Sequence, residues 1–115
     1  GVTVGPWSMV GPNVKIGDGT EIRSHVLIEK NTTLGADCVI HQGAVLGTDP
    51  QDLKYRGEET FLVVGDRTVI REYATANRGT ADLVTTNIGH DCLLMAYSHV
   101  AHDSQIGTTW SSPTP

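Results

Sequence analysis

Residues 2–47 read VTVGPWSMVGPNVKIGDGTEIRSHVLIEKNTTLGADCVIHQGAVLG, and a period of six residues runs through them. Every sixth residue from Val4 onward is aliphatic: Val4, Val10, Ile16, Ile22, Ile28, Leu34, Ile40 and Leu46. The residue two positions before each is small or β-branched: Val2, Ser8, Val14, Thr20, Val26, Thr32, Cys38 and Ala44. Since residues two apart in a strand share a side, each hexapeptide is expected to bury one residue of each kind. Glycine often follows the aliphatic position, where we expect it to permit a tight corner.

The same period returns further along the chain, with two interruptions. Its later aliphatic positions are Val64, Ile70, Ile88, Leu94, Val100 and Ile106. Asp52 and Glu58 occupy aliphatic positions, which predicts a loop outside the repeat at about residues 48–61. Asp82 predicts a shorter excursion at about 80–85. We therefore expect one repeat domain over residues 1–107.

Three hexapeptide strands would close one triangular coil of about 18 residues, and successive coils would stack through parallel hydrogen bonds. The interior is then a thin prism with little room for large side chains, in agreement with the aromatic content of 5% and the 13 glycines. The sequence predicts an all-β fold: a parallel β-helix of about six coils with an extruded loop.

Composition excludes several classes of protein. No apolar run approaches the roughly 18 residues of a membrane span, so no transmembrane segment is predicted. The formal net charge of −5 disfavours binding to nucleic acid. Cys38 and Cys92 match no metal-binding spacing and are too few for a disulfide framework, so we expect free thiols and a cytoplasmic location.

The predicted loop carries an unusual set of polar residues. Residues 51–58 read QDLKYRGE, with two cations and two carboxylates. Five of the eight basic residues lie between 54 and 78: Lys54, Arg56, Arg67, Arg71 and Arg78. They predict a cationic zone for an anionic ligand, such as a nucleotide-sugar diphosphate or a phosphopantetheine arm. The alternative is a solvated polar loop with scattered surface cations.

A second departure from the repeat is residues 95–103, which read MAYSHVAHD. Val100 takes the inward position, so His99 should point outward and His102 with Asp103 should lie at the following corner. A histidine beside an aspartate has the ingredients of a general base. A zinc ion shared by His99 and His102 between subunits is the alternative, but no third ligand has a suitable spacing, and no metal site is predicted.

Four motifs together resemble one family. They are QDLKY at 51–55, GDR at 65–67 with IRE at 70–72, NRGT at 77–80, and LLM at 93–95 running into HVAHD at 99–103. The sequence resembles, over about residues 2–107, the acyl-carrier-protein-dependent UDP-N-acetylglucosamine O-acyltransferases, which perform the first step of lipid A biosynthesis. The resemblance implies a left-handed β-helix and transfer of a (3-hydroxy)acyl chain from acyl carrier protein to the sugar 3-hydroxyl, with no cofactor.

The resemblance also implies roles for single residues. His102 would be the general base that takes the proton of the 3-hydroxyl as that oxygen attacks the acyl thioester. Asp103 would orient His102, and His99 would line the same site. Gln51, Asp52 and Lys54 would contact the sugar nucleotide and the acyl chain. Relatives are homotrimers with the site between neighbouring rods, so a homotrimer is expected.

Members of this family continue for several more coils and a helical domain, so we expect this chain to be an incomplete version. A non-catalytic β-helical module and another hexapeptide acyltransferase are the alternatives. The tail at 108–115 reads TTWSSPTP and breaks the period. A shift of one nucleotide could restore aliphatic residues there, which makes a frameshifted tail the expectation.

Overall fold

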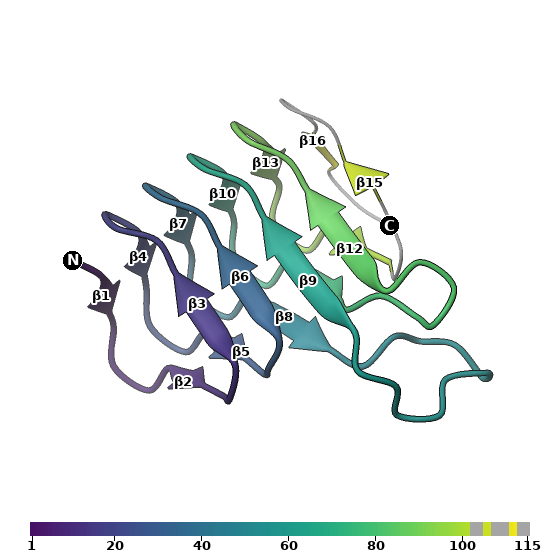
Figure 1. Ribbon diagram of the computed structural model, residues 1–115. Coiled ribbons are helices and arrows are strands. Elements are labelled where there is room, and N and C mark those ends of the chain that lie inside the picture. Colours follow the sequence, from purple (N-terminus) through teal and green to yellow (C-terminus); the bar gives the residue numbers. More distant parts are fainter. Residues whose placement is uncertain (102–104, 107–110, 113–115) are drawn as a thin grey trace.

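The computed structural model describes residues 1–101, 105–106 and 111–112, and this part of the chain is built from strands. The strands form three parallel sheets (Figure 1). Sheet A contains β1 (Thr3–Val4), β4 (Glu21–Ile22), β7 (Val39–Ile40), β10 (Val69–Ile70), β13 (Leu93–Leu94) and β16 (Ser111–Ser112). Sheet B contains β2 (Met9–Val10), β5 (Leu27–Ile28), β8 (Val45–Thr48), β11 (Thr75–Asn77) and β14 (His99–Val100). Sheet C contains β3 (Val14–Ile16), β6 (Thr32–Leu34), β9 (Phe61–Val64), β12 (Thr85–Ile88) and β15 (Gln105–Ile106).

The chain visits the three sheets in turn, so three consecutive strands make one coil. Ile22 pairs with Val4 on one side and Ile40 on the other, each 18 residues away in the sequence. The described strands complete five coils, and β16 begins a sixth. The chain is therefore a parallel β-helix, which confirms the fold predicted from the repeat, and it is left-handed, as the family resemblance implied. The described residues contain no helix that could span a bilayer.

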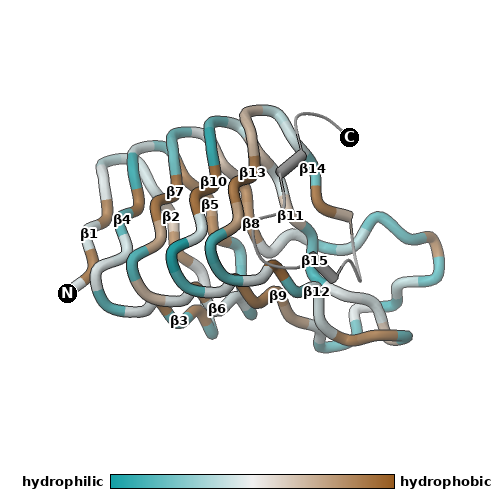
Figure 2. The backbone as a smooth tube through the Cα atoms, turned by 90° about the horizontal axis from the view of Figure 1, so that it is seen from above, coloured by the Kyte–Doolittle hydropathy of each residue, from teal (hydrophilic) through white to brown (hydrophobic). Residues whose placement is uncertain are grey.

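Both inward positions of the repeat are filled as predicted. On sheet A the aliphatic column is Ile22, Ile40, Ile70 and Leu94, all at most 1% exposed. The small column beside it is Thr20, Cys38, Thr68 and Cys92, also buried. Figure 2 shows hydrophobic segments at the same place in successive coils. The coil that contains β1 to β3 has a neighbour on one side only, and its Val2, Val4 and Val10 are exposed.

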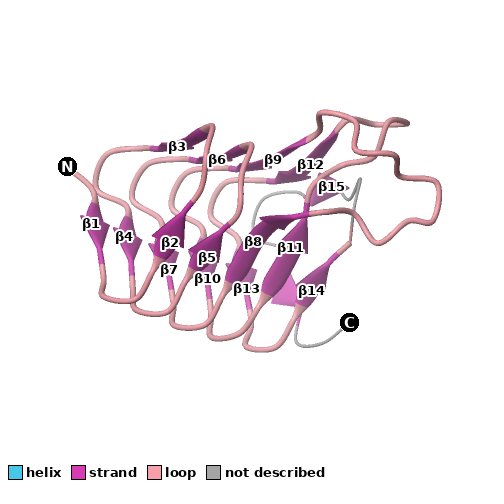
Figure 3. Cartoon of the chain, turned by 90° about the horizontal axis from the view of Figure 1, so that it is seen from below, coloured by secondary structure: helices cyan, strands magenta, loops and turns pink. Residues whose placement is uncertain are grey.

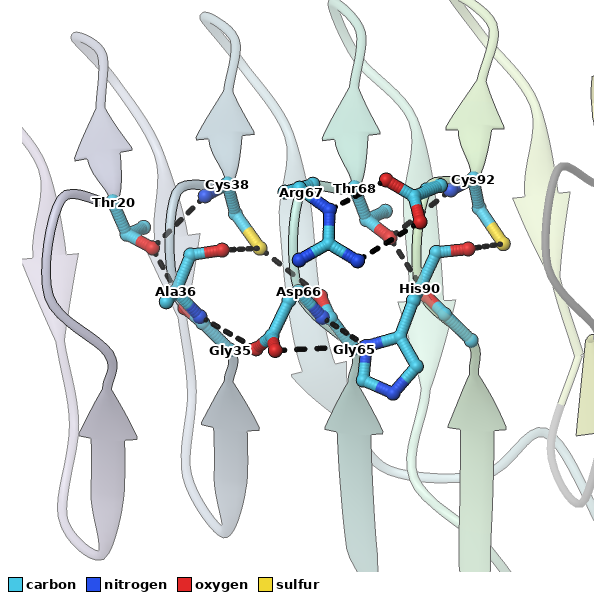
Figure 4. A network of polar contacts seen from close by, with 12 residues as sticks. Thr20, Gly35, Ala36, Cys38, Gly65, Asp66, Arg67, Thr68, His90 and Cys92 are labelled. Carbon is cyan, nitrogen blue, oxygen red and sulfur yellow. Dashed lines mark hydrogen bonds and ion pairs between the residues drawn. The ribbon is translucent and has the colours of Figure 1, made fainter.

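The two cysteines are free and buried, as the sequence predicted. They lie in the same column two coils apart, which at ~4.8 Å per coil separates them by about 10 Å and puts a disulfide out of reach. The Cys38 thiol faces the Gly65 carbonyl oxygen at 3.1 Å (Figure 4). Burial raises the pKa of this thiol.

Gly47, which follows Leu46, has the left-handed backbone expected of a corner glycine, with a φ of 76°, but other glycines after aliphatic positions have a different role. Gly17 and Gly65 do not have a left-handed backbone. A Cβ on Gly17 would lie 2.6 Å from the carbonyl carbon of Gly35, and one on Gly65 equally close to that of Gly89. Their absent side chains let one coil approach the next. Two residues after Gly17 and Gly65, Gly19 and Arg67 adopt the left-handed conformation of the corner, with φ of 79° and 57°.

Two connections leave the prism at the corner where sheet B passes to sheet C, here called the B–C corner. Residues 49–60 connect β8 to β9, and residues 78–84 connect β11 to β12. Thr48, Phe61 and Thr85, which the sequence placed at the edges of loops, are strand residues. The two loops project from the same side (Figure 3).

Most of the tail at 108–115 lies outside the described residues, including Trp110. In the described part, Ser112 pairs with Leu94, in the register of the aliphatic position.

Replacing Gly65 by alanine should lower the free energy of unfolding by about 3 kcal/mol, because the new methyl group meets backbone atoms that cannot rotate away. Urea denaturation measures the change. Gly57→Ala is the control: its Cβ has open space around it but a φ of +86°, so the cost should be only about 1 kcal/mol. Equal costs for the two variants would contradict the account of coil stacking.

Neither Cys38 nor Cys92 should react with a thiol reagent in the folded chain, because both are at most 2% exposed. After denaturation without a reductant, two thiols per chain should be alkylated, as counted by mass spectrometry. Thiols that stay blocked in the denatured chain would contradict the free-cysteine assignment.

Candidate active site

A small depression lies between the two loops at the B–C corner. The 49–60 loop contributes Asp52, Lys54, Tyr55 and Glu58, and the shorter loop contributes Thr80, Ala81 and Asp82. The structure thus brings the predicted Asp52 and Lys54 together. The sequence did not predict the second group, although Asp82 in an aliphatic position was the signal that a loop begins there.

The 49–60 loop is shaped by turns of its own. The backbone N–H of Lys54 donates to the Asp52 carboxylate at 3.0 Å, and the N–H of Tyr55 donates to the Asp52 carbonyl at 3.0 Å. This is the turn that an aspartate side chain typically stabilises. Arg56 N–H donates to the Glu58 carboxylate at 2.8 Å, which lowers the pKa of Glu58.

The polar ends of two predicted site residues remain free in this loop. Gln51 and Lys54 are exposed, and neither side chain has a hydrogen bond or ion pair with any described residue. An uncommitted ammonium group beside a carboxylate is suited to a ligand that carries both phosphate and hydroxyl groups.

Arg78 lies at the base of the loop and is completely buried. Its guanidinium donates to the Gly47 carbonyl and to the Asp49 carboxylate, both at 2.5 Å, and to the Tyr55 hydroxyl at 3.0 Å. Sequence reasoning counted Arg78 among cations available to an anionic ligand. That interpretation is wrong, because the guanidinium is enclosed by the chain's own groups.

The other predicted cations do not gather at the loop either. Arg67 makes a two-pronged ion pair with Asp91 at 2.8 and 3.0 Å, at the corner between sheets C and A (Figure 4). Arg71 binds Glu72 at 2.9 Å at the corner between sheets A and B, and lowers the pKa of Glu72 to about 2. The prediction of a single cationic zone is therefore wrong. Each hexapeptide takes the chain to the next of the three sheets, so cations that are close in sequence lie at different corners.

His99 lies on the outer face of sheet B, as strand alternation predicted. Its neighbours Ser98 and Val100 are 1% and 2% exposed, whereas His99 is half-buried. Its Nδ1 lies 2.7 Å from the Thr75 hydroxyl, one coil away. This contact leaves Nε2 as the nitrogen available to a ligand.

The remaining predicted residues are not joined to His99 in the described part of one chain. No described contact connects His99 with Gln51, Asp52 or Lys54. His102 and Asp103 lie outside the described residues. Among the residues that the structure describes, no group of three or more His, Cys, Asp or Glu side chains could hold a metal ion.

The first residues of the chain match a known family of repeat proteins. Residues 1–30 match the family model described as bacterial transferase hexapeptide (six repeats). The stacked coils agree with this match, and the class of the fold is a hexapeptide-repeat β-helix.

Individual relatives then define the family. An acyl-[acyl-carrier-protein]–UDP-N-acetylglucosamine O-acyltransferase of Saccharophagus degradans is 48% identical over 107 residues, covering 92% of this chain and 42% of the relative. The protein of that name from Azorhizobium caulinodans is 47% identical and covers 92% and 40%. The chain belongs to this family, and it spans about two fifths of the length of these relatives.

Solved structures agree with this assignment. The LpxA structure from Acinetobacter baumannii is 42% identical with a TM-score of 0.94, covering 97% of this chain and 45% of that one. The UDP-N-acetylglucosamine O-acyltransferase of Moraxella catarrhalis is 47% identical with a TM-score of 0.90, covering 92% and 42%.

Thr75→Val should release the imidazole of His99, because valine keeps the shape of threonine but cannot bond Nδ1. Nitrogen-15 NMR of the imidazoles should detect a change in the chemical shift of His99 Nδ1 between the unchanged chain and the variant. His25, at the distant corner between sheets A and B, is the internal control and should not change. An unaltered chemical shift of His99 Nδ1 in the variant would contradict the Thr75 contact.

Proposed function

We propose that this chain provides the sugar-nucleotide loop and the general base of an acyltransferase. The reaction transfers a (3-hydroxy)acyl chain from acyl carrier protein to the 3-hydroxyl of UDP-N-acetylglucosamine, the first step of lipid A biosynthesis. The observation that carries the proposal is identity of 44–48% over more than nine tenths of the chain to four relatives of that name.

The chemical step needs one base. His102, as the neutral imidazole, takes the proton of the 3-hydroxyl while that oxygen forms a bond to the thioester carbonyl carbon. The tetrahedral intermediate expels the phosphopantetheine thiolate, which receives the same proton from the imidazolium. Asp103 orients His102 and stabilises its charged form. No cofactor is required, because the thioester already activates the acyl group.

Residues of the 49–60 loop and His99 bind the substrate. The free ammonium of Lys54 suits a phosphate oxygen of the nucleotide, and Asp52 suits the hydroxyl groups of the sugar. Gln51 can donate and accept hydrogen bonds beside them. His99 presents Nε2 to the same substrate.

We place the complete site between chains of a homotrimer. Support comes from the separation of His99, on sheet B, from the loop residues at the B–C corner within one chain. A neighbouring copy could bring its loop to the His99 face, so that one substrate contacts both. We also propose a cytoplasmic location, where the two free thiols stay reduced.

A second candidate is a β-helical module that does not catalyse, since no described contact joins His99 to Asp52 or Lys54 within one chain. The two candidates differ in whether acyl transfer depends on residues of this chain.

The test uses the Saccharophagus degradans relative with its matching segment replaced by this chain. In this chimera His102→Ala should lower kcat by about 10²- to 10⁴-fold, because a general base contributes that much. Asp52→Ala should mainly raise the KM for UDP-N-acetylglucosamine. Product formation by mass spectrometry and thermal unfolding are measured for each variant.

The unmutated chimera is the control. More than a tenth of its kcat in His102→Ala would overturn the base assignment, as would a chimera that folds and forms no product. Either result would favour the non-catalytic module.

A further inference from the structure

A buried cation at the B–C corner is left unused by the proposed chemistry. Arg78 has no exposed side-chain surface, and its guanidinium faces groups of its own chain. Besides Gly47, Asp49 and Tyr55, the Glu29 carboxylate lies 4.0 Å away. Two of these groups, Asp49 and Tyr55, belong to the 49–60 loop.

This loop has no strand partner that could fix its position. It leaves the prism after Thr48 and returns at Phe61. The Arg78 guanidinium donates hydrogen bonds to the first residue of the loop, Asp49, and to a residue in its middle, Tyr55. The Tyr55 hydroxyl in turn donates to the Glu58 carbonyl at 2.9 Å, so the same contact reaches the second half of the loop.

Asp52 and Lys54, the proposed substrate-binding residues, are connected to Tyr55 by hydrogen bonds that involve the loop backbone. Tyr55 N–H donates to the Asp52 carbonyl at 3.0 Å, and the Asp52 carboxylate accepts the N–H of Lys54 at 3.0 Å. A shift of Tyr55 would therefore move Asp52 and Lys54, two of the residues that line the depression.

The chemistry of the side chain fits this task. A guanidinium offers several donors in one rigid plane, and here they engage a carbonyl, a carboxylate and a hydroxyl at once. A lysine ammonium on a flexible stem could not reproduce that set of directions. Only the Arg78 end of the ion pair with Asp49 is buried, since the Asp49 side chain is 63% exposed. The pair is therefore better suited to fixing one geometry than to adding stability.

We propose that Arg78 is a positioning residue that holds the 49–60 loop and thereby places Asp52 and Lys54 against the sugar nucleotide. The placement of substrate rests on the proposed function. The hold on the loop does not depend on it and is measured separately.

The hold is tested by limited trypsin digestion of the folded chain, because the loop contains Lys54 and Arg56 as cleavage sites. Tyr55→Phe removes one hydroxyl, and Asp49→Asn removes one charge. Each should speed cleavage at these sites about three- to tenfold, the effect of losing one such hydrogen bond. Tyr73→Phe is the matched control, since the Tyr73 ring stacks on Tyr97 at the distant corner between sheets A and B.

The consequence for substrate is tested in the chimera. Tyr55→Phe and Asp49→Asn should raise the KM for UDP-N-acetylglucosamine about three- to tenfold while kcat changes less than about twofold. Arg78→Lys should give the same pattern, without rescue by the retained charge. Should Arg78→Lys fail to fold, the Tyr55 and Asp49 variants carry the test.

The outcomes separate the two proposals. If trypsin cleaves Tyr55→Phe and Asp49→Asn no faster than Tyr73→Phe, the proposal that Arg78 holds the 49–60 loop is overturned. The positioning role would be overturned by a second result: faster cleavage in Tyr55→Phe and Asp49→Asn with an unchanged KM for UDP-N-acetylglucosamine. This holds if Asp52→Ala does raise that KM. If Asp52→Ala also leaves the KM unchanged, the assignment of this loop to the sugar nucleotide fails instead.

Discussion

Each coil of this protein lies directly on the next, held by parallel backbone hydrogen bonds such as that from Gly35 N–H to the Val64 carbonyl at 2.8 Å. Every inward side chain therefore contacts the residue at the same position of the neighbouring coil, which produces uninterrupted columns. Such columns bury aliphatic side chains without a wide core, and this explains how a chain with so few aromatic residues folds. The same constraint excludes a side chain at Gly17 and Gly65.

Stacking also determines where functional groups can lie. The prism has no space for a site inside, so ligand-binding residues must sit on outer faces or on segments that leave a corner. The 49–60 and 78–84 loops leave the same corner because their strands, β8 and β11, are neighbours in sheet B. A loop on a rigid prism still needs a hold of its own, and the buried Arg78 provides it.

The repeat made the fold predictable, because a period of six assigns every residue an inward or outward side. The sequence also identified the loop that carries Asp52 and Lys54. The sequence did not correctly predict where the cations lie: Arg67, Arg71 and Arg78 are close in sequence but lie at three different corners. Coil stacking brings Asp91 to Arg67 and Asp49 to Arg78, whereas Glu72 is the sequence neighbour of Arg71. The repeat itself does not reveal the enclosure of Arg78. Strand alternation around Val100 indicated His102 and Asp103 as a candidate base and its partner, and the family resemblance then assigned their roles.

The most direct test of the account is a crystal structure of the chimera with UDP-N-acetylglucosamine bound. The account predicts the sugar nucleotide against the 49–60 loop, with Lys54 and Asp52 in contact and the sugar 3-hydroxyl about 3 Å from an imidazole nitrogen of His102. Arg78 should keep its contacts with Asp49 and Tyr55 in that complex. A sugar nucleotide bound away from this loop, or with its 3-hydroxyl out of reach of His102, would contradict it.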